Sequence, residues 1–191
     1  MGFLTSAGKF ILGRRLSTID HFSKNPLKFQ HQILKYLLLK AKKTEYGKRH
    51  FFNEIETYDD FKNKIPVVNY EEFFPEIKKV LLGAENIIWP ERFKWFAKSS
   101  GTTNDKSKFI PVSDESLKNN HLKSGKDLLS QYINKNSSNL FDGYSVALGG
   151  SRQLAPYEKN KKIFVGDISA VLLKNLPYWA KTIRTPKLGV A

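Results

Sequence analysis

The chain has 191 residues, no cysteine, and 32 Lys and Arg residues against 18 Asp and Glu residues, giving a formal net charge of +14. Its length is sufficient for one domain with a buried core, and a hydrophobic content of 40% argues against a disordered chain. The absence of cysteine excludes disulfides, thiolate metal sites and cysteine nucleophiles, and it favours a cytoplasmic protein. The lysines are dispersed, so charge alone does not separate nucleic acid, membrane surface and phosphate-bearing ligands as partners.

The N-terminal stretch MGFLTSAGKFILGRRL allows three interpretations. Gly2 and Ser6 fit the N-myristoylation pattern, and apolar residues beside Lys9 and two arginines fit a short amphipathic anchor. A helix that packs on its own domain explains the same pattern, and we favour it because such short matches often arise by chance. Lys9 interrupts the apolar run, which argues against a signal peptide. No apolar run approaches the roughly 18 residues of a transmembrane span.

Two helical regions are predicted in the first half of the chain. Pro26 is placed to open a helix with Asn25 as its N-cap, and apolar residues follow helical spacing as far as Ala41. Gly47 is the expected stop signal. Two shorter helices, with Thr57 and Asn69 as N-caps, flank the extended sequence IPVV. We expect Pro75 to kink or split the second of these helices and Gly83 to end it.

The second half alternates strands and helices, which indicates an α/β fold. Strands are predicted at Arg92–Ser99, Lys108–Ser113, Gly143–Gly150 and Lys162–Gly166, because aromatic and β-branched residues or tight-turn glycines mark them. Ser113 is placed to cap a long helix after the second strand. These strands are too few for a large sheet, so the sequence has the pattern of the front part of a longer protein.

The sequence SSGTTNDKSK, residues 99–108, joins the first two predicted strands and contains hydroxyl, ammonium and small side chains. Backbone N–H groups in such a turn can converge on phosphate oxygens, and the side chains add donors and positive charge. A Walker A loop is excluded because it needs glycine where Ser100 and Asp105 stand, and a helix directly afterwards. A polar hairpin turn remains the alternative, since Asn104 and Asp105 are common turn residues.

The chain resembles the auxin-responsive acyl-acid amido synthetase family and its bacterial relatives, within the luciferase-like adenylate-forming superfamily. The resemblance lies in residues 29–48, 55–90, 96–115 and 165–177. The resemblance implies ATP-dependent activation of a small carboxylic acid as an acyl-adenylate, followed by amide formation with an amino acid. It implies ATP and Mg²⁺ as cofactors. It also implies that residues 1–191 are the N-terminal portion of a larger adenylate-forming domain, with helices packed on a partial mixed sheet and the C-terminal part absent. We therefore expect the chain to be inactive alone.

By position, the resemblance assigns ATP-phosphate binding to the loop of residues 99–108. It implies that catalysis rests on positioning of the substrates and neutralisation of their charge. No catalytic residue is assigned. Most family loops carry glycine where this chain has Asn104 and Asp105, which places a carboxylate near the phosphates, and Mg²⁺ or Lys106 would have to offset it. The predicted ATP-binding residues are Ser99, Ser100, Gly101, Thr102, Thr103, Lys106 and Lys108.

Other chemical patterns are weak. The four histidines lack metal-ligand spacing, so no metal site is predicted. Asp167 is expected to be a turn or N-cap residue before a helix, because the family's ribose-binding Gly-Asp pair lies far downstream. Arg152 is interpreted as an ordinary exposed arginine.

Two alternative functions remain open. An acyl-CoA ligase of the same superfamily would share the first half-reaction and use a thiol acceptor. A basic nucleic-acid-binding module would need lysines clustered on one face with interleaved aromatic residues, and the sequence shows no such motif, so no nucleic-acid partner is predicted. The sequence names neither the acid nor the amine, and it does not indicate the oligomeric state.

Overall fold

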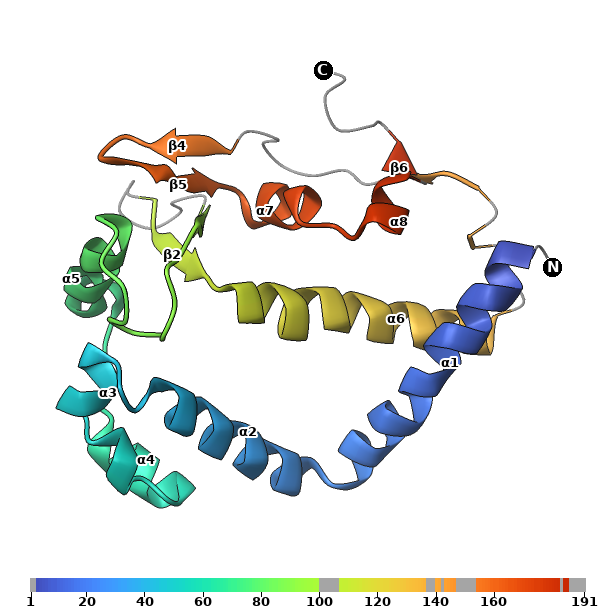
Figure 1. The fold of residues 1–191 in the computed structure, drawn as a ribbon. Helices are drawn as coiled ribbons and strands as arrows, with labels where there is room; N and C mark the ends of the chain where they lie inside the picture. The colour runs from blue at the N-terminus through green and yellow to red at the C-terminus, as the bar shows by residue number, and fades with distance from the viewer. Residues whose placement is uncertain are drawn as a thin grey trace. The chain divides into compact units, whose positions relative to one another are not determined.

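The computed structural model describes residues 3–99, 107–136, 140–141, 143–146, 154–182 and 184–185. It confirms an α/β fold (Figure 1). The chain divides into two compact units. The sheet unit comprises Asn25–Ser113 and Gln153–Ile168, and the helical unit comprises Met1–Lys24, Asp114–Arg152 and Ser169–Ala191.

The sheet unit contains a four-stranded mixed sheet within the described part of the chain, in the order β2-β1-β5-β4. The central strand β1 pairs antiparallel with β2 and parallel with β5, and β4 pairs antiparallel with β5. The sequence predicted β1, β2 and β5 but not β4. The strands are β1 (Trp95–Lys98), β2 (Phe109–Val112), β4 (Ala155–Tyr157) and β5 (Asn160–Gly166).

Helix α5 (Tyr70–Leu81) packs its apolar side into the core of the sheet unit. Phe96, at the centre of β1, is fully buried and lies in one cluster with Ile77 and Ile163. Asn69 begins α5 with a capping box, in which the side chains of Asn69 and Glu72 each accept a backbone N–H. The helix is not split at Pro75, and Gly83 follows its end at a φ of +99°, as predicted for a helix stop.

Within the sheet unit, the described helices before α5 are α2 (Pro26–Ala41), α3 (Glu45–Arg49), the 3₁₀ turn η1 (Phe52–Glu54) and α4 (Tyr58–Lys64). Pro26 opens α2 as predicted, but the side chain of Asn25 makes no capping hydrogen bond. Thr57 caps α4 with a complete capping box, which confirms that prediction.

The prediction that Gly47 stops a helix is wrong. Gly47 lies inside α3, whose N-cap is Thr44, and its backbone N–H donates to the Thr44 hydroxyl at 2.9 Å. A Cβ atom at position 47 would lie 2.1 Å from the main-chain oxygen of Ala41. Glycine is therefore needed here for the close approach of two backbone segments, which a local pattern does not reveal.

The helical unit contains α1 (Phe3–Lys24), a π-helical segment η2 (Ser116–His121) continuing into α6 (Leu122–Lys135), α7 (Ile168–Lys174, from Ser169 onward in this unit) and α8 (Tyr178–Thr182). α1 packs against α6, and Arg15 binds Asp127 through Nε at 2.7 Å and Nη2 at 3.0 Å. This contact supports the interpretation of α1 as a helix that packs on its own unit. The strands β3 (Ser145–Val146) and β6 (Arg184–Thr185) pair in parallel.

Other predicted segments fall partly inside and partly outside the described residues. The long helix begins at Asp114, directly after Ser113, and Asp167 directly precedes α7. Of the strand predicted at Gly143–Gly150, the structure shows Ser145–Val146, and residues 147–150 and Arg152 lie outside the described part. Within the described ranges, no helix has the length and apolar character needed to cross a membrane. The same ranges hold no group of His, Cys, Asp or Glu side chains that could bind a metal ion.

Candidate functional site

The hairpin of β1 and β2 brings together the two ends of the predicted phosphate loop. Lys98 pairs with Phe109 in the ladder, and Ser99 and Lys108 form the next pair. The backbone N–H of Ser99 donates to the main-chain oxygen of Lys108 at 3.0 Å. In return, the backbone N–H of Lys108 donates to the hydroxyl oxygen of Ser99 at 3.0 Å. The structure therefore places these two predicted residues at the base of the loop.

The Ser99 hydroxyl accepts this bond with a lone pair, so its hydrogen remains able to donate to an anion. The other predicted ATP-binding residues lie outside the described part of the chain, and their assignment stays a prediction. They are Ser100, Gly101, Thr102, Thr103 and Lys106.

Tyr70 anchors the strand that begins directly after Lys108, a contact that the sequence analysis missed. β2 is an edge strand, and the Phe109 N–H and C=O face the hydroxyl of Tyr70. The Phe109 N–H donates to Tyr70 Oη at 2.7 Å, and Tyr70 Oη donates to the Phe109 oxygen at 3.3 Å. Burial and the nearby Glu71 charge raise the pKa of Tyr70, while the bond with Phe109 acts in the opposite direction. The hydroxyl is therefore protonated at neutral pH and can act as donor and acceptor.

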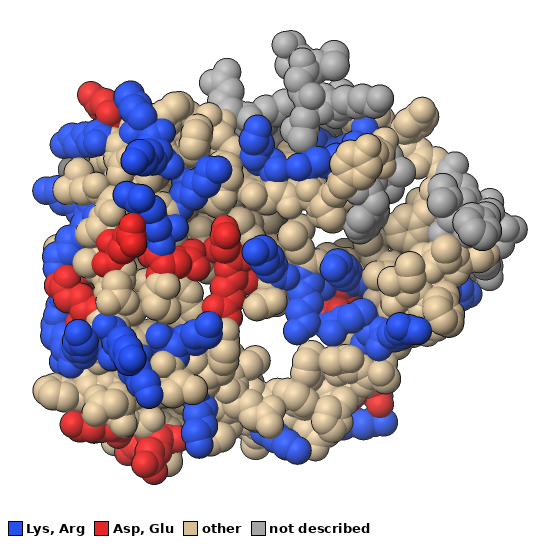
Figure 2. Space-filling model, viewed as in Figure 1, with Lys and Arg blue, Asp and Glu red and all other residues tan. Residues whose placement is uncertain are grey.

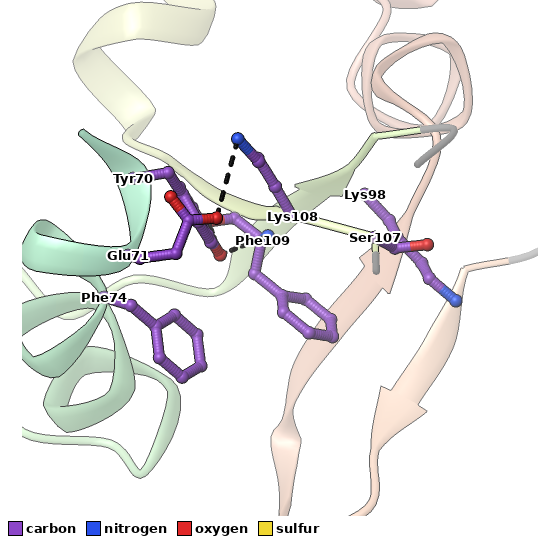
Figure 3. A pocket seen from close by; sticks show the side chains of 7 residues that line it. All are labelled: Tyr70, Glu71, Phe74, Lys98, Ser107, Lys108 and Phe109. Carbon is purple, nitrogen blue, oxygen red and sulfur yellow. Dashed lines mark hydrogen bonds and ion pairs between the residues drawn. The ribbon is translucent and has the colours of Figure 1, made fainter. Parts of the chain in front are cut away.

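Beside this anchor lies an open pocket of about 580 Å³ within the sheet unit (Figure 3). The aromatic rings of Phe74 and Phe109 form an apolar wall, and charged side chains lie around it. Figure 3 shows Lys108 and Glu71 directed toward one another, while Lys98 extends away from them. The lining residues are Tyr70, Glu71, Phe74, Lys98, Ser107, Lys108 and Phe109.

The Lys108 ammonium group is only loosely held. Its Nζ lies 3.9 Å from Glu71 Oε1 and 5.1 Å from the centre of the Tyr70 ring. The Lys108 side chain is 40% exposed and that of Glu71 is 71% exposed, so water screens the pair. Such pairs contribute about 0–1 kcal/mol to stability. An incoming anion therefore meets little competition for Lys108.

On the face shown in Figure 2, the basic side chains around α3, α4 and α5 are interrupted by acidic ones. Figure 2 shows Asp and Glu side chains among the Lys and Arg side chains in this region. Alternating charge of this kind weakens the long-range field that a polyanion needs for binding.

A family model, described as the GH3 family N-terminal domain, matches residues 15–190. The chain belongs to the GH3 family. This confirms the resemblance to the auxin-responsive acyl-acid amido synthetases that the sequence motifs indicated.

Curated relatives of this GH3 chain include plant amido synthetases. It is 31% identical over 105 residues to indole-3-acetic acid-amido synthetase GH3.5 of Arabidopsis thaliana, a match covering 54% of this chain and 17% of that protein. It is 30% identical over 104 residues to a probable indole-3-acetic acid-amido synthetase GH3.2 of Oryza sativa subsp. japonica, again covering 54% of this chain and 17% of that protein. The chain thus matches about a sixth of the length of these relatives.

A solved structure, GH3.15 acyl acid amido synthetase, superposes with a TM-score of 0.70 at 23% identity. The match covers 85% of this chain and 29% of that protein. It shows that this GH3 chain shares the fold of an acyl acid amido synthetase, including the mixed sheet with helices packed on it.

Proposed function

We propose that this GH3 chain supplies the ATP-phosphate loop of an acyl-acid amido synthetase. The observation that carries the proposal is the hairpin closed by Ser99 and Lys108, which holds a hydroxyl donor and a loosely paired ammonium group at the base of the loop. Both groups fit phosphate oxygens, because one donates a hydrogen bond and the other supplies positive charge. Family membership supports the same assignment.

ATP with Mg²⁺ is the nucleotide substrate in this proposal. When bound, it supplies the α-phosphate that the substrate carboxylate attacks, giving an acyl-adenylate and pyrophosphate. The chain's own residues bind and orient the β- and γ-phosphates and offset their charge, which is catalysis by positioning and electrostatic stabilisation. The residues we assign to this task are Ser99, Ser100, Gly101, Thr102, Thr103, Lys106 and Lys108.

The remaining parts of the proposal concern the complete protein. We propose that residues 1–191 are the N-terminal portion of a larger adenylate-forming domain that acts in the cytoplasm. Its substrates are a small carboxylic acid and an amino acid. An amide product is favoured over a thioester because the named relatives are amido synthetases.

Turnover of the complete protein tests this proposal. AMP, pyrophosphate and amide are measured by mass spectrometry with a panel of carboxylic acids and amino acids. Substitution Lys108→Ala is expected to lower kcat/KM by roughly 100-fold, because a charge that stabilises the phosphates is lost. Ser99→Ala is expected to lower it less, since a neutral donor is removed. Lys62→Ala, at an exposed position on α4, is the matched control. Equal turnover of all three variants, or formation of a thioester instead of an amide, would contradict the proposal.

A further inference from the structure

We propose that Tyr70 and Glu71 are positioning residues for Lys108: Tyr70 fixes the first residue of β2, which directly follows Lys108, and Glu71 holds the Lys108 ammonium group until a phosphate oxygen replaces the carboxylate. This inference rests on the proposed phosphate site and adds two residues that the sequence analysis did not assign. Both belong to the first turn of α5 and line the pocket beside β2 (Figure 3).

The backbones of two consecutive residues, Lys108 and Phe109, are each held by hydrogen bonds. Ser99 binds both the N–H and the C=O of Lys108, and Tyr70 binds both the N–H and the C=O of Phe109. The N–H and C=O of Phe109 lie on the outer side of the edge strand β2 and would be unpaired within the sheet without Tyr70. Four hydrogen bonds therefore fix the main chain around Lys108, so that only its side chain changes position when a ligand binds.

The Lys108 side chain, by contrast, has a distant and exposed partner in Glu71. The Nζ to Oε1 distance of 3.9 Å is longer than a charge-assisted hydrogen bond, and Glu71 is largely exposed. A polyphosphate carries more charge than one carboxylate and therefore competes well for the ammonium group. The neighbouring Glu72 cannot take this role, because its carboxylate accepts the backbone N–H of Asn69 at 2.8 Å.

Binding of sodium tripolyphosphate to the 191-residue chain tests the exchange between carboxylate and phosphate. Affinity is measured by isothermal titration calorimetry, and the Lys108 ammonium signal is followed by NMR with labelled lysine. Glu71→Gln is expected to bind about two- to fivefold more tightly than the wild type, because the competing carboxylate is gone. Glu56→Gln changes the net charge equally at an exposed position outside the pocket, and it is expected to change affinity by less than about 1.5-fold.

Tyr70→Phe tests the backbone anchor, since it keeps the ring beside Lys108 and removes only the hydroxyl. We expect about three- to tenfold weaker tripolyphosphate binding and faster hydrogen exchange of the Phe109 amide, because the edge-strand bonds are lost. Tyr58→Phe, at an exposed position on α4, is the matched control. A merely structural role of Tyr70 would lower the melting temperature and leave the affinity unchanged, which would overturn its assignment as a positioning residue.

The outcomes separate this inference from the proposed function. If tripolyphosphate shifts the Lys108 signal but Glu71→Gln and Tyr70→Phe bind with wild-type affinity, the positioning roles are wrong and the phosphate site stands. If the wild-type chain neither binds tripolyphosphate nor shows a change at Lys108, both the positioning roles and the proposed phosphate site are wrong.

Discussion

Two carboxylates on the same helix, Glu71 and Glu76 of α5, have opposite surroundings. The Glu76 side chain is 9% exposed and its Oε1 lies 2.6 Å from Arg49 Nη1. The Glu71 side chain is 71% exposed and its Oε1 lies 3.9 Å from Lys108 Nζ. The Arg49–Glu76 pair joins α3 to α5, whereas the Lys108–Glu71 pair leaves the Lys108 ammonium group available to a ligand in the pocket.

Glu76 is part of a closed arrangement of four charges. Arg49 and Lys79 each form ion pairs with both Glu45 and Glu76. Burial by itself raises the pKa of Glu76, but the ion pairs with Arg49 and Lys79 outweigh burial and lower it. Burial and several partners make the Glu76 carboxylate a structural element, while exposure and one distant partner leave the Glu71 carboxylate exchangeable.

The largest expected effect comes from removing the close approach that places α3. Gly47→Ala would put a Cβ atom 2.1 Å from the Ala41 oxygen and 2.9 Å from its carbonyl carbon. Both neighbours are backbone atoms, so relieving the clash requires the main chain itself to shift. We expect a loss of about 3 kcal/mol or more in the free energy of unfolding, measured by urea denaturation.

Gly125→Ala in α6 is the matched control for this substitution, because no heavy atom beyond the adjoining helix backbone and the neighbouring residues lies within 4 Å of the Cβ position. Alanine is the better helix former, so this variant should gain about 0.5–1 kcal/mol. Equal effects of the two substitutions would contradict the close approach at Gly47.

The next effect in size is that of Glu76→Gln. The substitution removes the charge that Arg49 and Lys79 share, while Glu45 and solvent still contact both cations. We expect a loss of about 1–3 kcal/mol, measured by urea denaturation at neutral pH, because one side of the pair is buried. A loss no larger than that of Glu71→Gln would contradict the difference between the two carboxylates.

The stability that Glu76 contributes is expected to depend on pH. The folded-state pKa of Glu76 is lowered, so its stabilising contribution is present above the unfolded carboxyl pKa of about 4.3. That contribution is lost as the pH falls through the lower folded pKa. The difference in unfolding free energy between wild type and Glu76→Gln should therefore shrink below about pH 4.5, measured by urea denaturation from pH 3 to pH 6. A difference that grows with acid would show that the sign is wrong.

The smallest expected effect is that of Glu71→Gln on stability. Its ion pair with Lys108 is long and exposed, so we expect a change of less than about 0.5 kcal/mol. Thermal unfolding measured at low and high salt should be nearly identical to that of the wild type. A loss comparable to that of Glu76→Gln would mean that the Lys108 pair is structural and unsuited to exchange.

Much of the local structure could be predicted because its causes lie within a few residues. The capping bonds of Thr57 and Asn69 each span three residues, and the strand character of β1 and β2 resides in their own aromatic and β-branched side chains. The short strand β4 was missed because its pairing with β5, and not its own composition, makes it a strand.

The candidate site was partly predictable for the same reason. Residues 99–108 carry a recognisable motif, so Ser99 and Lys108 could be named from the sequence. Tyr70 could not be named, because its bonds to Phe109 join residues 39 positions apart. A tyrosine in the first turn of a helix gives no local signal of such a contact.

The sequence by itself determined the α/β class, the capped helices, the hairpin strands and the family motif, since each depends on local chemistry. Only the tertiary structure decided that Gly47 lies against the backbone of Ala41, that Tyr70 anchors β2, and that Glu71 and Glu76 differ in burial. The physical reason is that burial and long-range hydrogen bonds depend on which segments the fold brings together. Two glutamates on the same helix can therefore acquire different roles.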